Sequence, residues 1–228
     1  MKEIKEKNQL RLIIIKTYDM KKRKKMQIII RQTEKQDYNY TENFTREIFW
    51  NLFTPGCTDH FILHNLRKSK DYIPQLDLLV IYNNKIVGHI ISSKAKVVDN
   101  QHNEHEVLCV GPFAISPEMQ SKGIGTQLLK HSISVAKELA FKGMILFGNP
   151  NYYHRFGFDD ARKYGITTKD GQNFPPFMAL ELQKNGFGEI TGKFFDDDAF
   201  QVEEDEFAEF EKMFPEKEKG KPKFPINI

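Results

Sequence analysis

The sequence predicts an α/β fold in which helices flank a mixed β-sheet. Three observations carry this prediction. Residues 107–115 are mostly apolar and β-branched, which is typical of a buried strand. A glycine-containing turn at residues 120–125 follows this strand. After the turn, apolar residues recur at helical spacing from Leu128 to Ala140. A strand, a turn and a helix therefore succeed one another.

The remaining elements follow from the same patterns. The expected strands are residues 27–31, 76–82, 85–92, 107–115, 144–148 and 177–182. Helical segments are expected within residues 37–53 and 59–68, separated by Pro55-Gly56. Asn83-Asn84 predicts a hairpin between two of the strands, because asparagine tolerates positive φ.

The turn before the long helix has the features of an anion site. The first turn of a helix offers unpaired backbone N–H groups and a partial positive charge. Gly123 and Gly125 lack the Cβ atoms that would keep a phosphate from those amides. Lys122 supplies a mobile cation, and Ser121 or Thr126 a hydroxyl. These residues predict a cradle for a diphosphate.

The glycine spacing fits neither the P-loop nor the dinucleotide-binding fingerprint. The spacing Gln-x-x-Gly-x-Gly instead resembles the phosphate loop of the GNAT superfamily of N-acetyltransferases, which holds the pyrophosphate of acetyl-coenzyme A (acetyl-CoA). The resemblance implies that acetyl-CoA contacts Gln120, Ser121, Lys122, Gly123, Ile124, Gly125 and Thr126.

The strand before the loop extends the resemblance. Gly111-Pro112 interrupts it where proline cannot donate to a ladder, so a bulge or a parting of strands is expected. The family separates its parallel fourth and fifth strands here, within a mostly antiparallel central sheet flanked by helices. The pantetheine arm of the coenzyme enters the gap. Phe113, Ala114 and Ile115 are then expected to pair with that arm through their backbone groups.

Residues 149–158 complete the match. Their ending, Tyr153 to Phe158, looks like the Tyr-x-x-x-Gly-Phe element of the family. Residues 107–158 resemble the predicted acetyltransferase branch labelled YhbS-like, and a looser resemblance runs from about residue 26 to 200. It implies an acyltransferase that moves an acetyl group from acetyl-CoA to an amine of a small molecule or peptide, by direct attack in a ternary complex. The alternative is a non-catalytic acyl-CoA-binding regulatory module.

The resemblance also suggests catalytic roles. Tyr153 is the expected general acid near the coenzyme sulfur, although it also fits a core aromatic position. A catalytic glutamate of some family members is replaced here by Cys109. Glu106, Glu104 or a water chain could then serve as the base, with Glu106 the candidate, although both glutamates also fit a polar turn and strand edge. The asparagine of the family motif is replaced by Leu146, and Asn149 substitutes for it only by proximity.

His60 and His64 share one helical face. Since the second helix of the family borders the acceptor site, they either line a substrate pocket or pack at the edge of a surface helix. No third ligand accompanies them, so no metal site is expected.

Charge divides the chain. Residues 1–25 carry ten Lys or Arg against three acids. This basic extension is expected to be disordered, or not native with a start at Met26, rather than to bind nucleic acid or lipid. Residues 26–200 are expected to form the acetyltransferase domain. Residues 201–228 are expected to be an acidic and then Pro- and Lys-rich tail; Phe207 and Phe210 allow a docking amphipathic helix before a solvated end.

Composition narrows the remaining choices. With 39% hydrophobic residues the chain can bury a sizeable core. No apolar run approaches the length of a membrane span, and two cysteines make no disulfide framework. We therefore expect a cytoplasmic protein, monomeric or homodimeric, that acts on acetyl-CoA and an unidentified amine without membrane partners.

Overall fold

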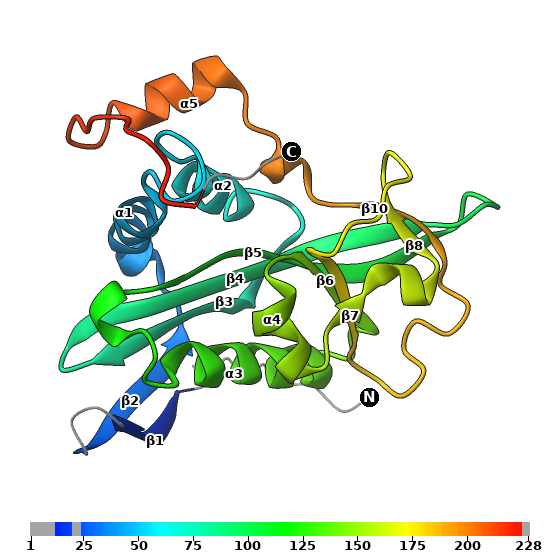
Figure 1. The fold of residues 1–228 in the computed structure, drawn as a ribbon, viewed down its shortest axis with the longest axis horizontal. Coiled ribbons are helices and arrows are strands. Elements are labelled where there is room, and N and C mark those ends of the chain that lie inside the picture. The colour runs from blue at the N-terminus through cyan, green and yellow to red at the C-terminus, as the bar shows by residue number, and fades with distance from the viewer. Residues whose placement is uncertain (1–11, 20–23, 225–228) are drawn as a thin grey trace, which may run out of the picture.

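The computed structural model describes residues 12–19 and 24–224 (Figure 1). Its helices are α1 (Tyr38–Phe49), α2 (Asp59–Leu66), α3 (Ile124–Glu138), α4 (Pro150–Tyr153) and α5 (Glu204–Glu211). Its strands are β1 (Ile13–Asp19), β2 (Lys24–Gln32), β3 (Tyr72–Tyr82), β4 (Lys85–Val98), β5 (Glu104–Ile115), β6 (Gly143–Phe147), β7 (Asp159–Asp160), β8 (Ile166–Thr168), β9 (Phe177–Glu181) and β10 (Gly192–Phe195).

One mixed sheet organises these strands. Its order is β1-β2-β3-β4-β5-β6-β9-β7, with β10 added to β4 and β8 added to β10. The β5–β6 and β10–β8 pairs are parallel and the other described pairs are antiparallel. The predicted α/β class with a mostly antiparallel sheet and parallel fourth and fifth family strands, here β5 and β6, is confirmed. The hairpin turn has positive φ at both Asn83 and Asn84, as predicted.

Helices cover the two faces of the sheet. In Figure 1, α1 and α2 lie on one face, with α5 outside them, and α3 lies on the other. Between α3 and the sheet, alternate residues of the strands and the apolar stripe of the helix form the larger core. Its fully buried members include Leu78, Val80, Ile90, Leu128 and Leu129.

A second core lies where the far ends of β4 and β5 meet the later strands. Val107, Cys109 and Ile145 contribute from β5 and β6, and Phe177 and Phe194 from β9 and β10. Because β10 pairs with β4 and β8 pairs with β10, the sheet curves around these side chains. This curvature brings the C-terminal ends of β6, β8 and β10 together.

The expected basic extension is partly a strand. Ile13–Asp19 forms β1, which pairs antiparallel with β2, so disorder is the wrong prediction for these residues. Ile13 and Ile15 pack against the larger core, and this burial outweighs the surrounding charge. Residues 1–11 and 20–23 lie outside the described residues.

Removing residues 1–25 is therefore expected to lower stability. The truncation exposes the edge of β2 and removes the partial burial of two isoleucines, worth about 1–3 kcal/mol. Thermal melting of chains that begin at Leu12 and at Met26 measures the effect of β1 itself. Equal melting temperatures would show that β1 adds nothing to the fold.

The C-terminal region is docked on α1 and α2. Rings of Phe207, Phe210 and Phe214 surround His60, with centroids 5.1–5.8 Å from its ring. The amphipathic helix allowed by the sequence is therefore present as α5. The segment after it is not a solvated tail: Trp50 Nε1 donates to the Glu218 carbonyl at 2.9 Å, and the Lys223 N–H donates to the Asn51 carbonyl. The Trp50 indole and the Asn51 backbone carbonyl, directly after α1, thus hold a segment whose proline and lysine content favours a solvated tail.

Within the described residues, no helix has both the length and the apolar character needed to cross a membrane.

Candidate active site

A bulge in β5 shapes the centre of the molecule. Ile90 of β4 pairs with Phe113 and Ser92 pairs with Val110, so Ile91 faces two residues, Gly111 and Pro112. A Cβ on Gly111 would lie 3.1 Å from side-chain atoms of both Ile91 and Leu66. The glycine therefore lets α2 approach the bulged strand closely, and the predicted irregularity is confirmed.

β5 and β6 pair over only a short distance. Leu108 pairs with Met144 and Cys109 with Ile145, and no pairing with β6 continues along β5 to Ile115 among the described residues. Phe113, Ala114 and Ile115 still pair with β4 on their other side. One edge of the last part of β5 is consequently open to an extended ligand.

The loop after β5 leads directly into α3. Ser121 and Gly123 both have positive φ, and Gly123 is the N-cap residue of α3. Within the described part of the chain, no group accepts a hydrogen bond from the backbone N–H of Ile124, Gly125 or Thr126. Three such donors at the positive end of a helix dipole are the features that favour binding of an anion. The loop geometry fits the predicted diphosphate cradle.

Tyr152 closes one side of this loop. A Cβ on Gly125 would lie 2.9 Å from the Tyr152 hydroxyl oxygen and 3.4 Å from Ile115 and Phe113. Arg155 lies over the Tyr152 ring, 4.2 Å from its centroid. Gly125 thus keeps room between the helix and α4, a contact that the motif spacing did not reveal.

Tyr153 is the last residue of α4 and lies next to Tyr152, beside the loop. Its ring packs edge-on against Tyr152 and Phe158, and it occupies the space that a side chain on Gly148 would need. Burial, and then the neighbouring Tyr152, raise the pKa of Tyr153 above its ordinary value. None of the described residues bonds to the Tyr153 hydroxyl. The group is therefore protonated at neutral pH and able to donate.

The other predicted coenzyme contacts have local partners. The Gln120 side-chain amide donates to the Ile115 carbonyl at 3.2 Å and so steadies the loop. Lys122 Nζ lies 3.8 Å from the Met119 sulfur. Asn149 is the N-cap of α4, where its side chain accepts from the Asn151 N–H at 3.0 Å. Asn149 thus orients the helix that carries Tyr153.

The predicted base candidates lie on the surface. Glu106 Oε2 is 2.7 Å from Lys94 Nζ, and Glu104 is paired with Lys96; all four side chains are at least 41% exposed. None of their described contacts is with Tyr153 or the phosphate loop. Cys109 is fully buried, and this burial raises the pKa of its thiol, with a further contribution from Asp196 and Asp197. Cys109 is therefore a neutral thiol at physiological pH.

The two histidines are enclosed by other residues. His60 is fully buried, and its Nε2 lies 2.8 Å from Glu211 Oε2 on α5. His64 Nδ1 lies 3.1 Å from Glu42, and its ring is 4.5 Å from that of Phe210. Both contact the docked C-terminal segment, so contact between His60 and an acceptor would require α5 to move. Within the described residues there is no group of three or more potential metal ligands.

A charged network holds α1 and α2 on the sheet. Asp77 of β3 is fully buried and accepts from Arg67 Nε at 2.9 Å and from the Tyr72 hydroxyl at 3.0 Å. His89 of β4 lies 2.7 Å from the same carboxylate. Despite burial, these partners keep the pKa of Asp77 below its ordinary value, so Asp77 is ionised. Its ion pair with Arg67, at the end of α2, fixes this helix in place.

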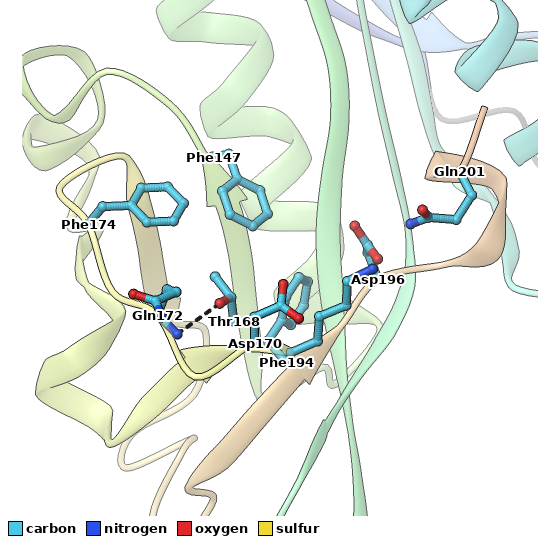
Figure 2. Close-up of a pocket in the computed structure, with 9 residues that line it drawn as sticks. Phe147, Thr168, Asp170, Gln172, Phe174, Phe194, Asp196 and Gln201 are labelled. Atoms are coloured by element: carbon cyan, nitrogen blue, oxygen red, sulfur yellow. Dashed lines mark hydrogen bonds between the residues drawn. The ribbon is translucent and has the colours of Figure 1, made fainter. Parts of the chain in front are cut away.

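A cavity of about 260 Å³ lies at the C-terminal ends of β6, β8 and β10 (Figure 2). Phe147, Phe174 and Phe194 supply aromatic surface, and Asp170 and Asp196 supply carboxylates. Local sequence patterns do not identify this set, because its members come from separate segments that only the curvature of the sheet brings together. The local signal in the sequence is the run of three acids Asp196, Asp197 and Asp198.

Comparisons with known proteins agree with this geometry. A model described as the acetyltransferase (GNAT) family matches residues 40–158, just over half of the chain. The uncharacterized N-acetyltransferase YjhQ of Escherichia coli K12 is 28% identical over 98 residues, which cover 43% of this chain and 54% of the relative. The uncharacterized N-acetyltransferase YhbS of the same strain is 22% identical over 108 residues, covering 47% and 63%. The chain thus spans roughly half to two thirds of these relatives.

Two solved structures share the fold. One is a GNAT family N-acetyltransferase (YhbS) from Escherichia coli in complex with CoA, with a TM-score of 0.67, 18% identity and coverage of 77% of this chain and 92% of that one. The other is a GNAT family acetyltransferase from Brucella melitensis in complex with acetyl-CoA, with a TM-score of 0.62, 22% identity and coverage of 76% and 98%.

Proposed function

Since the chain belongs to the acetyltransferase (GNAT) family, we propose that it is an N-acetyltransferase which uses acetyl-CoA. The observation that carries the proposal is the open edge of β5 leading into a helix start with free N–H donors. An acyl-CoA has an extended amide arm followed by a diphosphate. The open edge of β5 matches the arm, and the start of α3 that follows it matches the diphosphate. That the two structures of similar fold contain CoA and acetyl-CoA supports this ligand.

In the proposed complex, residues 113–115 and 120–126 bind the coenzyme mainly through their backbone groups. The amides from Gln120 to Thr126 hold the pyrophosphate. Phe113, Ala114 and Ile115 pair with the pantetheine arm as an added strand would. The thioester then lies near Tyr153, at the place where β5 and β6 separate.

Acetyl transfer follows by direct attack of a neutral amine on the thioester carbonyl. The C–N bond forms, the C–S bond breaks, and Tyr153 donates its proton to the departing thiolate. The raised pKa of Tyr153 keeps that proton available at neutral pH. Glu106 stays a candidate for accepting the amine proton through water, since its ion pair is exposed.

A second function is an acyl-CoA-binding regulatory module. Cys109 in place of a glutamate, and the surface position of Glu104 and Glu106, are the observations that favour it. We also propose a cytoplasmic location for either function, because Cys57 and Cys109 are both unbonded thiols.

Gly125→Val is expected to weaken acetyl-CoA binding at least tenfold. The new side chain enters the space beside the α3 amides and meets the Tyr152 hydroxyl. Calorimetry with acetyl-CoA measures the change, and thermal melting confirms that the variant is folded. Tyr152→Phe is the matched control, since it removes the hydroxyl without filling the loop. Unchanged affinity in folded Gly125→Val would contradict the proposed coenzyme site.

A further inference from the structure

The cavity beside β6 has an aromatic wall that reaches the surface. Phe147 and Phe174 are 48% and 40% exposed, and their rings stack with centroids 5.9 Å apart. Phe194 is buried, and the centroid of its ring lies 6.3 Å from that of Phe147. Figure 2 shows Phe147 and Phe174 on one side of the cavity and Asp170, Phe194 and Asp196 on the other. The cavity volume of about 260 Å³ is just below the usual range for ligand pockets, about 300–1,000 Å³, which suits a molecule of single-ring size.

The polar part of the same cavity favours a cation. Two of its lining residues are acids, Asp170 and Asp196, and one is a base, Lys169. Within the described part of the chain, neither carboxylate accepts a hydrogen bond from another residue. Asp196 is half-buried, and burial raises its pKa, partly offset by the charge of Lys169. The Asp196 backbone N–H is the donor found for its carboxylate among the described residues. A half-buried carboxylate with so few donors is a place where an ammonium group can replace lost hydration.

The cavity is next to the proposed reaction centre. Phe147 is followed directly by Gly148, and the Tyr153 ring fills the space where a Gly148 side chain would stand. On the opposite side, Asp196 is near enough to Cys109 for its charge to contribute to the raised pKa of that thiol. Cys109 is the last residue of β5 that pairs with β6. The cavity therefore lies beside the point where the strands separate and the thioester is expected.

We propose that this cavity binds the acetyl acceptor, and that the acceptor is a small primary amine whose ammonium group pairs with Asp196 and whose aromatic or alicyclic body contacts Phe147 and Phe174. The proposal rests on the proposed acetyl transfer and names its substrate class. It also assigns Asp196, rather than Glu106, as the group that receives the first amine proton.

The protons balance in this scheme. The bound ammonium gives one proton to Asp196, and the neutral nitrogen attacks the thioester carbonyl carbon. As the C–S bond breaks, Tyr153 protonates the thiolate. The nitrogen then loses its second proton, which returns through water to the Tyr153 phenolate. Asp196 releases its proton to solvent, so the products are an amide, a free thiol and one proton.

Binding and turnover test the proposal separately, using the full chain. N,N-dimethylphenethylamine keeps the ring and the positive charge but cannot form a stable amide. We expect calorimetry to detect its binding, and phenethylamine to be acetylated with release of thiol. Phenylpropionate, which has a similar ring with the opposite charge, is expected not to compete.

Two variants locate the binding site. Asp196→Asn is expected to weaken the dimethyl compound, and to raise KM for phenethylamine, about ten- to hundredfold, as for loss of a charge-assisted hydrogen bond. Phe174→Ala should weaken binding through loss of ring contact. Asp198→Asn removes the same charge from an exposed neighbour outside the cavity and should leave both constants unchanged.

The outcomes distinguish this inference from the proposed function. Binding that depends on Asp196, without turnover of phenethylamine, would retain a cation site and overturn its assignment as the acetyl-acceptor site. Turnover of amines with the same KM in Asp196→Asn and Asp198→Asn would retain the transferase and overturn the site. Preference for phenylpropionate over the dimethyl compound would overturn the assignment of a cationic acceptor.

Discussion

Tyr153→Phe should lower the rate of acetyl transfer about ten- to thousandfold while changing acetyl-CoA affinity little. The substitution retains the ring that packs on Phe158 and Gly148, and removes only a hydroxyl that no described residue uses. The raised pKa of Tyr153 keeps this hydroxyl protonated. Loss of the hydroxyl therefore removes a proton donor rather than a structural hydrogen bond. Release of free thiol with a working acceptor measures the rate.

The matched control for Tyr153→Phe is Tyr164→Phe. Tyr164 packs against Phe187 in the second core, away from the loop, so its hydroxyl should not affect turnover. Equal rates for Tyr153→Phe and the parent chain would remove Tyr153 from the mechanism. If every amine fails although acetyl-CoA binds, the regulatory module becomes the better function.

Glu211→Ala should destabilise the protein by about 3–5 kcal/mol, the range for removing one partner of a buried ion pair, although Arg46 keeps contacts with Glu47 and the Pro215 carbonyl. Arg46 has a side chain only 2% exposed, and its Nε and Nη2 both donate to the Glu211 carboxylate. The same carboxylate contacts the buried His60. Denaturation by urea measures the free energy of unfolding.

Two further variants separate charge loss from helix loss. Glu209→Ala changes the same helix at an exposed position whose one ion pair among the described residues is with Lys212, so its effect should stay within about 0.5 kcal/mol. Arg46→Met combined with Glu211→Met should recover much of the stability, because no buried charge is left unpaired. If Glu211→Ala and Glu209→Ala cost the same, Arg46 does not depend on this contact.

Local sequence patterns predicted the parts of the fold that depend on neighbouring residues. The positive φ at Asn83 and Asn84, the bulge at Gly111 and the helix start at Gly123 all follow from residue types within a few positions. Helix ends were predicted only as limits: α1 lies within the expected residues 37–53 and ends at Phe49, where the chain turns back with the Gly56 N–H bonded to the Asn51 side chain.

Parts that depend on distant residues were not predictable in this way. The charge around β1 concealed two isoleucines whose burial depends on the sheet. Phe207 and Phe210 suggested a docked helix, but nothing local identifies Arg46 and His60 as its partners. Nothing local marks Asp196 as a cavity carboxylate, since its position relative to Phe147 is set by the pairing of β10 with β4. No single local pattern contains these contacts.

The docking of α5 on α1 and α2 also has a consequence for synthesis of the chain. Arg46 is translated 165 residues before its partner Glu211. At about 5–20 residues per second, the ribosome takes roughly ten to thirty seconds to cover that distance. During this interval the nascent chain carries a guanidinium and an apolar surface, including Phe61, that have no permanent cover. The surface of α1 and α2, which are among the first helices made, is thus covered only when α5 has been translated. Until then, the growing polypeptide offers a chaperone a defined site to bind.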